Sequence, residues 1–381
     1  MVFDYLPPAD VLTAVFVVYL VCLGGLGITA WLHNRTIARV PVRVHVGGSR
    51  GKTTTARYIG AALRASGRRV LVKTTGTRPL VILPDGSEVD WKRWGSPTIA
   101  ETVRFFRLAK RLEVDAVVLE SMAIEPEYLW ASETYLVRAT HVALTNARPD
   151  HAEVLGRDAD AMAHALGLLV PSAGTLFLTD ESDLPPIRAA AQRQGSPVIV
   201  TPTDSLVPDA TNRKLALAVC ESLGLDEDRA SAGFEMAGQD PGGFFARDIV
   251  VEGKKLRFHN AFACNDVDSL TLLWAEYPSD EPATVLLNAR ADRPERTRLF
   301  LDFLGGLSTP VQLVMTGAWR TSWVKRAGFD LRQVQALNEN RPDVALAKLA
   351  SVAQNNTIWG IGNYADIGQS LADHIRAKEA A

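Results

Sequence analysis

A glycine-rich segment that lies between an alternating run and an apolar helical pattern constrains the fold of this chain most. Residues 42–46 read VRVHV, the next segment reads GGSRGKTTT, and Ala56, Ile59 and Leu63 then recur at helical spacing until Gly67. A strand, a tight loop and a helix in direct succession are typical of the start of a βαβ unit. The sequence therefore predicts an α/β protein with a parallel sheet.

Short β-rich runs, separated by helical segments, continue this pattern at residues 70–72, 116–119, 142–144, 175–178 and 198–200. The alternation of strand and helix patterns is interrupted near residues 239–243, QDPGG. After this segment, residues 249–252 and 256–258 indicate a hairpin. Three more runs, at residues 284–287, 311–315 and 357–361, alternate with helices. We predict a doubly wound parallel-sheet domain at residues 40–238 and a smaller α/β domain at residues 239–381.

The N-terminal region contains an uncharged apolar stretch, residues 11–32, that is long enough to cross roughly 30 Å of hydrocarbon. Asp4 and Asp10 precede it and Arg35, Arg39 and Arg43 follow it, which favours a cytoplasmic location for the rest of the chain. A cleaved signal peptide would have a shorter apolar core with basic residues before it, and a buried soluble helix is the other alternative. We predict an anchor at residues 1–34 and a single-pass protein of the cell membrane, with both later domains cytoplasmic.

Charge and cysteine usage exclude some classes of function. The chain has 41 Lys+Arg and 43 Asp+Glu, a net charge of −2, so no overall positive field attracts nucleic acid, and we predict no nucleic-acid partner. Cys22, Cys220 and Cys264 show no metal-ligand spacing, as expected in a reducing compartment.

The glycine-rich loop has the residues of a phosphate site. Gly48 and Gly51 let the backbone approach an anion, and the following helix directs its N-terminal N–H groups at the same place. Lys52 can reach the outer phosphates of a nucleotide, and the Thr53 hydroxyl can bind Mg²⁺. Val46 stands where the longer form of this motif has glycine, so the loop is the shorter G-x-x-G-K-T form. The predicted nucleotide contacts in it are Gly48, Ser49, Arg50, Gly51, Lys52, Thr53 and Thr54.

This shorter loop resembles that of the Mur ligases, and two later segments extend the resemblance. Glu120 ends the apolar run at residues 115–120, and residues 146–151, NARPDH, are similar to the N-x-x-x-D-H element whose histidine is a metal ligand in that superfamily. The resemblance implies that Thr53, Glu120 and His151 hold Mg²⁺, and the histidine leaves room for Mn²⁺. Taken singly, Glu120 is equally compatible with a solvated strand end, and His151 with an ordinary surface histidine.

The resemblance also implies nucleotide contacts in the second domain. Residues 260–269 look like the Mur segment whose asparagine contacts adenine, which corresponds to Asn265. Asp292 falls where the superfamily has a ribose-binding aspartate, and Arg293 belongs to an arginine-rich segment suited to ATP phosphates or an anionic chain. The alternative for Asn265 and Asp292 is turn chemistry, because both residue types favour turns.

A more specific similarity is to the PgsB/CapB family of poly-γ-glutamate capsule synthesis. It rests on ordered short matches that include PVRV at residues 41–44, KTTGT at 73–77, SPTIAE at 96–101, ESMA at 120–123, DPG at 240–242 and GIGN at 360–363. The similarity implies an ATP-dependent amide ligase that activates a carboxylate as an acyl phosphate. The catalytic residues it implies are Lys52, Glu120, His151 and Lys73, the last to orient the acceptor. The implied partners are glutamate, a polyglutamate chain and integral-membrane subunits of a capsule-synthesis complex.

Three other hypotheses are compatible with parts of the sequence. A membrane-tethered P-loop ATPase would use the loop but would not need the elements at Asn265 and Asp292. A folylpolyglutamate or Mur-like ligase shares the loop, although fewer than twenty residues separate the apolar stretch from it, too few for the extra domain of cell-wall Mur ligases. A scaffold for a membrane complex leaves the loop unexplained.

Overall fold

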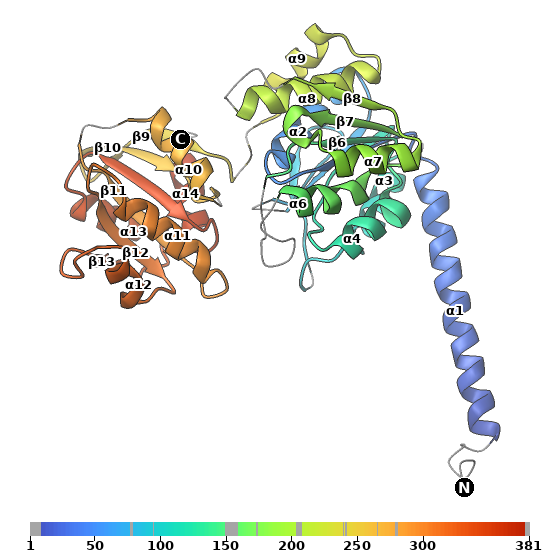
Figure 1. Cartoon of the computed structure of the whole chain (residues 1–381), viewed down its shortest axis with the longest axis horizontal. Coiled ribbons are helices and arrows are strands. Elements are labelled where there is room, and N and C mark those ends of the chain that lie inside the picture. The colour runs from blue at the N-terminus through green and yellow to red at the C-terminus, as the bar shows by residue number, and fades with distance from the viewer. Residues whose placement is uncertain are drawn as a thin grey trace. The chain divides into compact units, whose positions relative to one another are not determined.

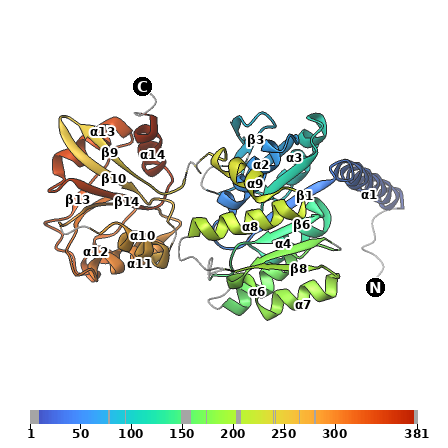
Figure 2. The same cartoon turned by 90° about the horizontal axis from the view of Figure 1, so that it is seen from above.

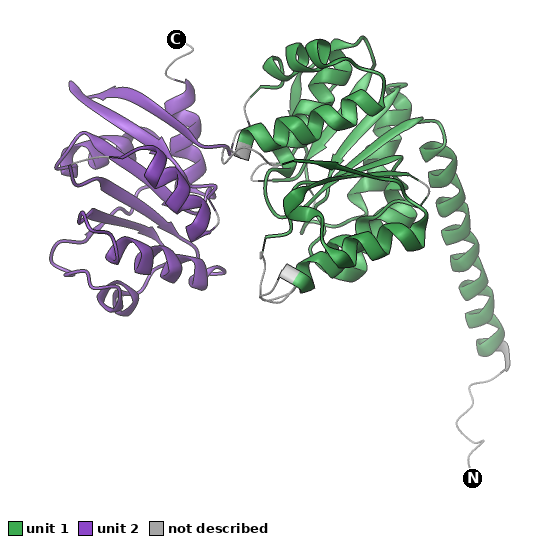
Figure 3. Ribbon diagram, turned by 45° about the horizontal axis from the view of Figure 1, so that its top comes forward, with its two compact units in different colours: residues 1–238 green, residues 239–381 purple. Residues whose placement is uncertain are grey.

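The computed structural model describes residues 9–76, 79–93, 95–148, 159–172, 174–202, 208–238, 240, 242–264, 266–278 and 281–377. The chain divides into two compact units, Met1–Gly238 and Gln239–Ala381, which Figure 3 shows in different colours.

Unit 1 is an α/β structure built on a mostly parallel sheet, as the sequence predicts. In the described residues the strand order is β4-β3-β2-β5-β1-β6-β7-β8. The strands are β1 Val42–Gly47, β2 Val70–Thr74, β3 Leu80–Ile82, β4 Glu88–Asp90, β5 Ala116–Glu120, β6 His141–Leu144, β7 Thr175–Thr179 and β8 Val198–Thr201. The β3–β4 hairpin, which the sequence patterns did not indicate, extends the sheet beyond β2 with antiparallel pairing.

Helices cover both faces of this sheet (Figure 2). The helices α2 Lys52–Ala65, α8 Pro208–Ser222 and α9 Glu227–Glu235 pack over one buried cluster. The other face is covered by α3 Glu101–Arg111, α4 Pro126–Ala131, the π-helix η1 Ser132–Val137, α6 Ala159–Leu166, η2 Gly167–Leu169 and α7 Pro185–Gln194. A short 3₁₀ turn, η3 Asp180–Ser182, follows β7. Burial on both faces explains why the central strands read as nearly continuous apolar runs.

The sheet register brings the loops of the site together. Val46 in β1 is opposite Glu120 in β5 on one side and Ala143 in β6 on the other. The carboxyl ends of these three parallel strands therefore lie side by side, and the segments that follow them share one edge of the sheet. In doubly wound sheets this edge is where ligands bind.

The N-terminal helix α1, Ala9–Ile37, leaves unit 1 beside α3 (Figures 1 and 2). Its segment Val11–Ile37 is long and apolar enough to cross a membrane. The last turns of α1 are packed into the unit, because Ile37 is buried in the core and His33 Nε2 donates a 3.0 Å hydrogen bond to Leu136 O in η1. The His33 ring also meets Phe106 of α3 edge-on, with 5.6 Å between centroids.

A buried side-chain hydrogen bond joins η1 to the central strand. His45 Nδ1 lies 2.8 Å from Glu133 Oε2, and both side chains are almost fully buried. The other oxygen, Glu133 Oε1, accepts a 2.7 Å hydrogen bond from the Ala139 N–H. The pair therefore fixes the π-helix that contacts α1 to the strand that leads into the glycine-rich loop.

Unit 2 is a second α/β structure with strand order β13-β12-β11-β14-β10-β9 in the described residues. Its strands are β9 Phe245–Val251, β10 Lys254–Asn260, β11 Thr284–Ala289, β12 Gln312–Gly317, β13 Gln335–Ala336 and β14 Thr357–Gly362, and β9–β10 is the predicted hairpin. One face is covered by α13 Pro342–Val352 and α14 Ile367–Ala377, the other by α10 Val267–Glu276, α11 Pro294–Gly305 and α12 Thr321–Arg326.

An aromatic cluster fills one side of unit 2. His259 stacks on Trp359 with centroids 4.3 Å apart and planes at 10°, and Tyr277 meets His259 edge-on. Among the described residues His259 Nδ1 has no hydrogen-bond partner. Burial, followed by the charge of Arg257, lowers the pKa of His259 to about 4, so this histidine is neutral at ordinary pH.

Candidate functional site

Two glycines shape the loop between β1 and α2. Gly48 has φ of 118° and Gly51 has φ of 79°, both in the left-handed region that favours glycine. Space is also limiting: a Cβ at Gly48 would collide with the Thr145 hydroxyl, and a Cβ at Gly51 would collide with the Asn212 side chain of α8. The loop can take this form only with glycine at both positions.

The segment after β6 holds the loop in place. Asn146 accepts hydrogen bonds of 3.1 Å from the Ser49 N–H, through its backbone oxygen, and from the Arg50 N–H, through Oδ1. Thr145 Oγ1 donates to Arg50 O at 2.5 Å, and Asn146 Nδ2 donates to the same oxygen at 3.1 Å. The sequence does not predict the positioning roles of Thr145 and Asn212, because their contacts depend on strand register and helix packing, which no local motif reveals.

Lys52 begins α2 and lies across the loop. Its Nζ donates hydrogen bonds to Gly48 O at 2.8 Å and to Ser49 O at 3.1 Å. These contacts keep the ammonium beside the N-terminus of α2, where the helix dipole and the N–H groups also favour an anion. The loop thus gathers positive charge on a backbone shaped to approach phosphate.

A hydroxyl and a carboxylate meet next to Lys52. Thr53 Oγ1 donates a 2.9 Å hydrogen bond to Glu120 Oε2, which also accepts from the Thr75 N–H at 2.7 Å. A Cβ at Gly76 would lie 2.7 Å from Thr53 Oγ1, so the lack of a side chain there keeps the oxygens accessible. Mg²⁺ prefers oxygen ligands and is commonly held by one or two carboxylates together with substrate phosphates, so Thr53 and Glu120 fit such an ion.

Lys73 lies in a buried ion pair. Its side chain is 2% exposed, and Nζ donates to Glu101 Oε2 at 2.9 Å, while Arg93 Nε donates to Glu101 Oε1 at 2.8 Å. Burial lowers the pKa of Lys73, although Glu101 acts in the opposite direction. Burial opposes ionisation of Glu101, but the hydrogen bonds from Lys73 and Arg93 outweigh it and lower the pKa of that carboxyl.

The remaining predicted contacts lie elsewhere. His151 and Asn265 are outside the described residues. In unit 2, Asp292 forms a two-point ion pair with Arg290, at 2.9 and 2.8 Å, on an exposed turn, and Arg293 directly precedes α11. This turn follows the carboxyl end of β11, an arrangement suited to a polar ligand.

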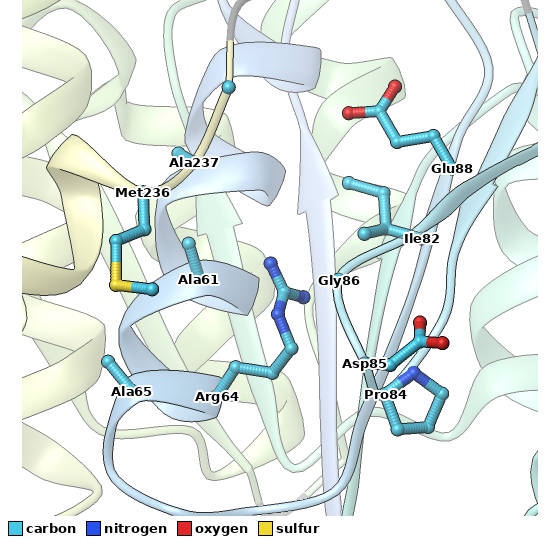
Figure 4. Close-up of a pocket in the computed structure, with 11 residues that line it drawn as sticks. Ala61, Arg64, Ala65, Ile82, Pro84, Asp85, Gly86, Glu88, Met236 and Ala237 are labelled. Atoms are coloured by element: carbon cyan, nitrogen blue, oxygen red, sulfur yellow. The ribbon is translucent and has the colours of Figure 1, made fainter.

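A separate cavity of about 510 Å³ lies at the other end of α2 from Lys52 (Figure 4). Arg64 projects between α2 and the β3–β4 hairpin, with Asp85 and Glu88 on the hairpin side and Met236 on the opposite wall. Because α2 separates it from the glycine-rich loop, the cavity is not part of the candidate nucleotide site.

Family profiles match most of the chain. The Mur ligase middle domain matches residues 46–218, and the poly-gamma-glutamate synthase CapB C-terminal domain matches residues 247–378. A bifunctional folylpolyglutamate synthase/dihydrofolate synthase, solved with Mn, AMPPNP and L-glutamate bound, shares the fold with a TM-score of 0.65 and 18% identity over 92% of both chains. The fold and site define an ATP-dependent amide-bond ligase of the Mur type.

Two curated proteins match over nearly the whole length. The PGA synthase CapB of Bacillus subtilis is 28% identical, over 90% of this chain and 92% of its own. The capsule biosynthesis protein CapB of Bacillus anthracis is 27% identical, over 91% of this chain and 79% of its own. The two profiles and the two relatives together support a CapB-type protein of the Mur ligase family.

Proposed function

We propose that this protein is a membrane-anchored ligase that uses ATP to add glutamate to a poly-γ-glutamate chain. The observation that carries the proposal is the hydrogen bond between Thr53 and Glu120, directly after the glycine-rich loop. The two curated relatives, a PGA synthase and a capsule biosynthesis protein, support the polymer as product. The proposed partners are glutamate, the growing chain and integral-membrane subunits of a capsule-synthesis complex.

The proposed nucleotide contacts are residues 48–54 of the loop, with Asn265, Asp292 and Arg293 in the second unit. Thr53 and Glu120, together with His151, would hold the divalent cation. The bound Mn and AMPPNP of the solved ligase support Mg²⁺ or Mn²⁺ and ATP as cofactors. When bound, the cation would neutralise charge on the outer phosphates.

The proposed chemistry passes through an acyl phosphate. A carboxylate oxygen at the end of the acceptor attacks the γ-phosphorus of ATP, and ADP leaves. The amine of the incoming glutamate then attacks the acyl carbon, phosphate leaves, and a proton is lost from nitrogen as the amide forms. Lys52 is positioned to offset charge on the transferred phosphoryl group, so its contribution is electrostatic.

For Lys73 we propose a positioning role in the same reaction. It is the penultimate residue of β2, and Thr75 and Gly76, which follow the strand, lie against Glu120 and Thr53. The buried pair with Glu101 fixes this strand end. An acceptor that binds along residues 73–77 would then meet a rigid backbone beside the phosphate loop.

The apolar helix supports the anchoring part of the proposal. Within the segment Val11–Ile37 of α1, the most apolar stretch of 18 residues is not buried by the rest of the described chain. Arg35 and Arg39 at its C-terminal end favour a cytoplasmic location for the ligase units.

The test uses membranes that contain the protein and any partner subunits it needs. With ATP, Mg²⁺ and a glutamate oligomer, we expect ADP and phosphate, and hydroxylamine should trap the acyl phosphate as a hydroxamate. Lys52→Ala is the control for background turnover. Release of AMP and pyrophosphate would contradict the mechanism. A preference for folate acceptors would identify a folylpolyglutamate ligase, and ATP turnover without hydroxamate or amide would identify a tethered ATPase.

A further inference from the structure

The anchor helix is packed firmly into unit 1 rather than joined by a loose linker. His33 is only 8% exposed, Thr36 and Ile37 are buried with it, and Val40 just beyond the helix is part of the same core cluster. The hydrogen bond from His33 to Leu136 and the contact with Phe106 fix the helix on two sides. The surface around this junction therefore keeps a defined position relative to α1.

The depth of the junction follows from the length of α1. About 20 helical residues cross roughly 30 Å of hydrocarbon, so a span that begins at Val11 ends near residue 30. The Arg35 guanidinium lies 4.6 Å from the ring centroid of Trp31, a pairing that suits the headgroup layer, where tryptophan and arginine are both favoured. His33 lies between them, and Leu136, which is hydrogen-bonded to His33, must lie at the same depth.

Four exposed side chains adjoin this junction, and we call them the headgroup patch: Trp130, Tyr135, Arg107 and Arg138. Tyr135 directly precedes Leu136, is 54% exposed, and meets Trp130, 46% exposed, edge-on with centroids 5.2 Å apart. Arg107 follows Phe106 on α3, and Arg138 directly follows η1. Two amphipathic rings and two guanidiniums around one junction fit a boundary between acyl chains and phosphates.

We propose that the headgroup patch binds the anionic surface of the bilayer. Arg107 and Arg138 pair with phospholipid phosphates, and Trp130 and Tyr135 enter the interfacial layer. Unit 1 thus rests on the membrane on this face. The inference depends on the proposed anchoring by α1 and is independent of the ligase chemistry.

The test places an environment-sensitive fluorophore on the patch of the full-length protein. Cys22 and Cys264 are replaced by serine, while Cys220 stays because it is buried, with its thiol pKa raised to about 12 by burial. Tyr135→Cys carries the fluorophore, and Trp130→Cys is the second labelling site in case the first variant fails to fold. Met236→Cys is the matched control, because Met236 is 73% exposed and lies beyond α9, on the other sheet face.

The protein is reconstituted into vesicles of phosphatidylcholine alone or mixed equally with phosphatidylglycerol. Headgroup spin labels should quench fluorescence at position 135 several-fold more than at 236, and more strongly in the anionic vesicles. Reversing Arg107 and Arg138 to glutamate should weaken the patch contact by roughly fivefold or more per residue, while Arg229→Glu on α9 should not.

Two results would overturn the inference in different ways. Extraction of the wild-type chain by alkaline carbonate would remove the anchoring and the patch proposal together. A firmly embedded chain whose label at 135 is as accessible to water as the label at 236 would remove only the patch proposal. Protection at 135 that occurs in native membranes but not in these protein-free bilayers would assign the face to a partner protein and so also overturn it.

Discussion

Thr53 Oγ1 and Glu120 Oε2 are joined by a 2.9 Å hydrogen bond although the two residues are 67 positions apart in the chain. The contact exists because β1 and β5 are neighbouring parallel strands in register at Val46 and Glu120. The fold itself thereby holds together a hydroxyl from the start of a helix and a carboxylate from the end of a strand. Such preorganisation is what a cation site next to phosphates requires.

Glu120→Gln is expected to lower ATP turnover without unfolding the protein. Glutamine keeps an oxygen to accept from the Thr75 N–H but removes the charge that would hold the cation. A lost metal contact of about 3 to 4 kcal/mol corresponds to roughly 10² to 10³ in rate. Steady-state ATPase assays over a range of Mg²⁺ concentrations measure this loss of turnover, and thermal unfolding checks that the variant is folded. Wild-type turnover at low Mg²⁺ would exclude Glu120 from the site.

Glu101→Gln should destabilise the protein more than Lys73→Met. The first change leaves the buried Lys73 ammonium without its carboxylate, which costs about 3 to 5 kcal/mol. The second leaves Glu101 still paired with Arg93. Denaturant unfolding gives both values. If Lys73 positions the strand end, folded Lys73→Met should change KM for the acceptor more than kcat. A total loss of kcat in a fully stable variant would indicate direct contact with substrate instead.

Acid should destabilise unit 2 through His259. Its pKa is about 4 when folded and about 6.5 in an unfolded chain, so the unfolded state binds more protons between these values. The stability contribution is complete above pH 6.5 and is lost as pH falls through 4, by about 3 kcal/mol in all. His259→Phe can keep the stack on Trp359 without titrating. The free energy of unfolding, measured by Trp fluorescence, should therefore differ less between pH 7 and pH 4 in the variant than in the wild type. An equal loss of stability in both proteins would contradict this.

Removal of residues 1–30 should release a folded unit from the membrane, because the buried contacts of His33 and Ile37 remain. Removal of residues 1–40 also deletes Ile37 and Val40, whose burial contributes roughly 3 to 6 kcal/mol together. Sedimentation with membranes and thermal unfolding distinguish the two truncations. A shorter chain that still resists alkaline extraction would show that the single-span interpretation is wrong.

Strong local signals made much of the fold predictable. The apolar runs at 116–119 and 142–144 became β5 and β6, and Ile367, Leu371 and Ile375 lie on the buried face of α14. The sequence does not predict the β3–β4 hairpin because each strand has only three residues, and those of β4 are all exposed while those of β3 are all buried, so neither strand shows an alternating pattern. β3 is defined by its antiparallel pairing with β2, a tertiary contact, and β4 by its antiparallel pairing with β3.

The candidate site shows the same difference between local motifs, which the sequence predicts, and tertiary contacts, which it does not. The left-handed glycines and the start of a helix at Lys52 could be predicted because a glycine-rich loop is a continuous segment with its own conformational demands. The contact of Asn212 with Gly51 could not, because α8 is separated from the loop by more than a hundred residues. The pairing of Lys73 with Glu101 likewise depends on packing of α3 against the strand end, and a lysine in a polar motif gives no sign that it will be buried.

The short connection between α1 and the phosphate loop sets a limit on where the chemistry can occur. Ile37 ends the helix and Gly47 ends β1, and ten residues of extended chain cannot exceed roughly 35 Å. If α1 spans a bilayer, the loop works within that reach of the lipid surface throughout every catalytic cycle. Under the proposed function, a polymer end extended there would stay within reach of the proposed integral-membrane subunits, without a diffusive search through the cytoplasm.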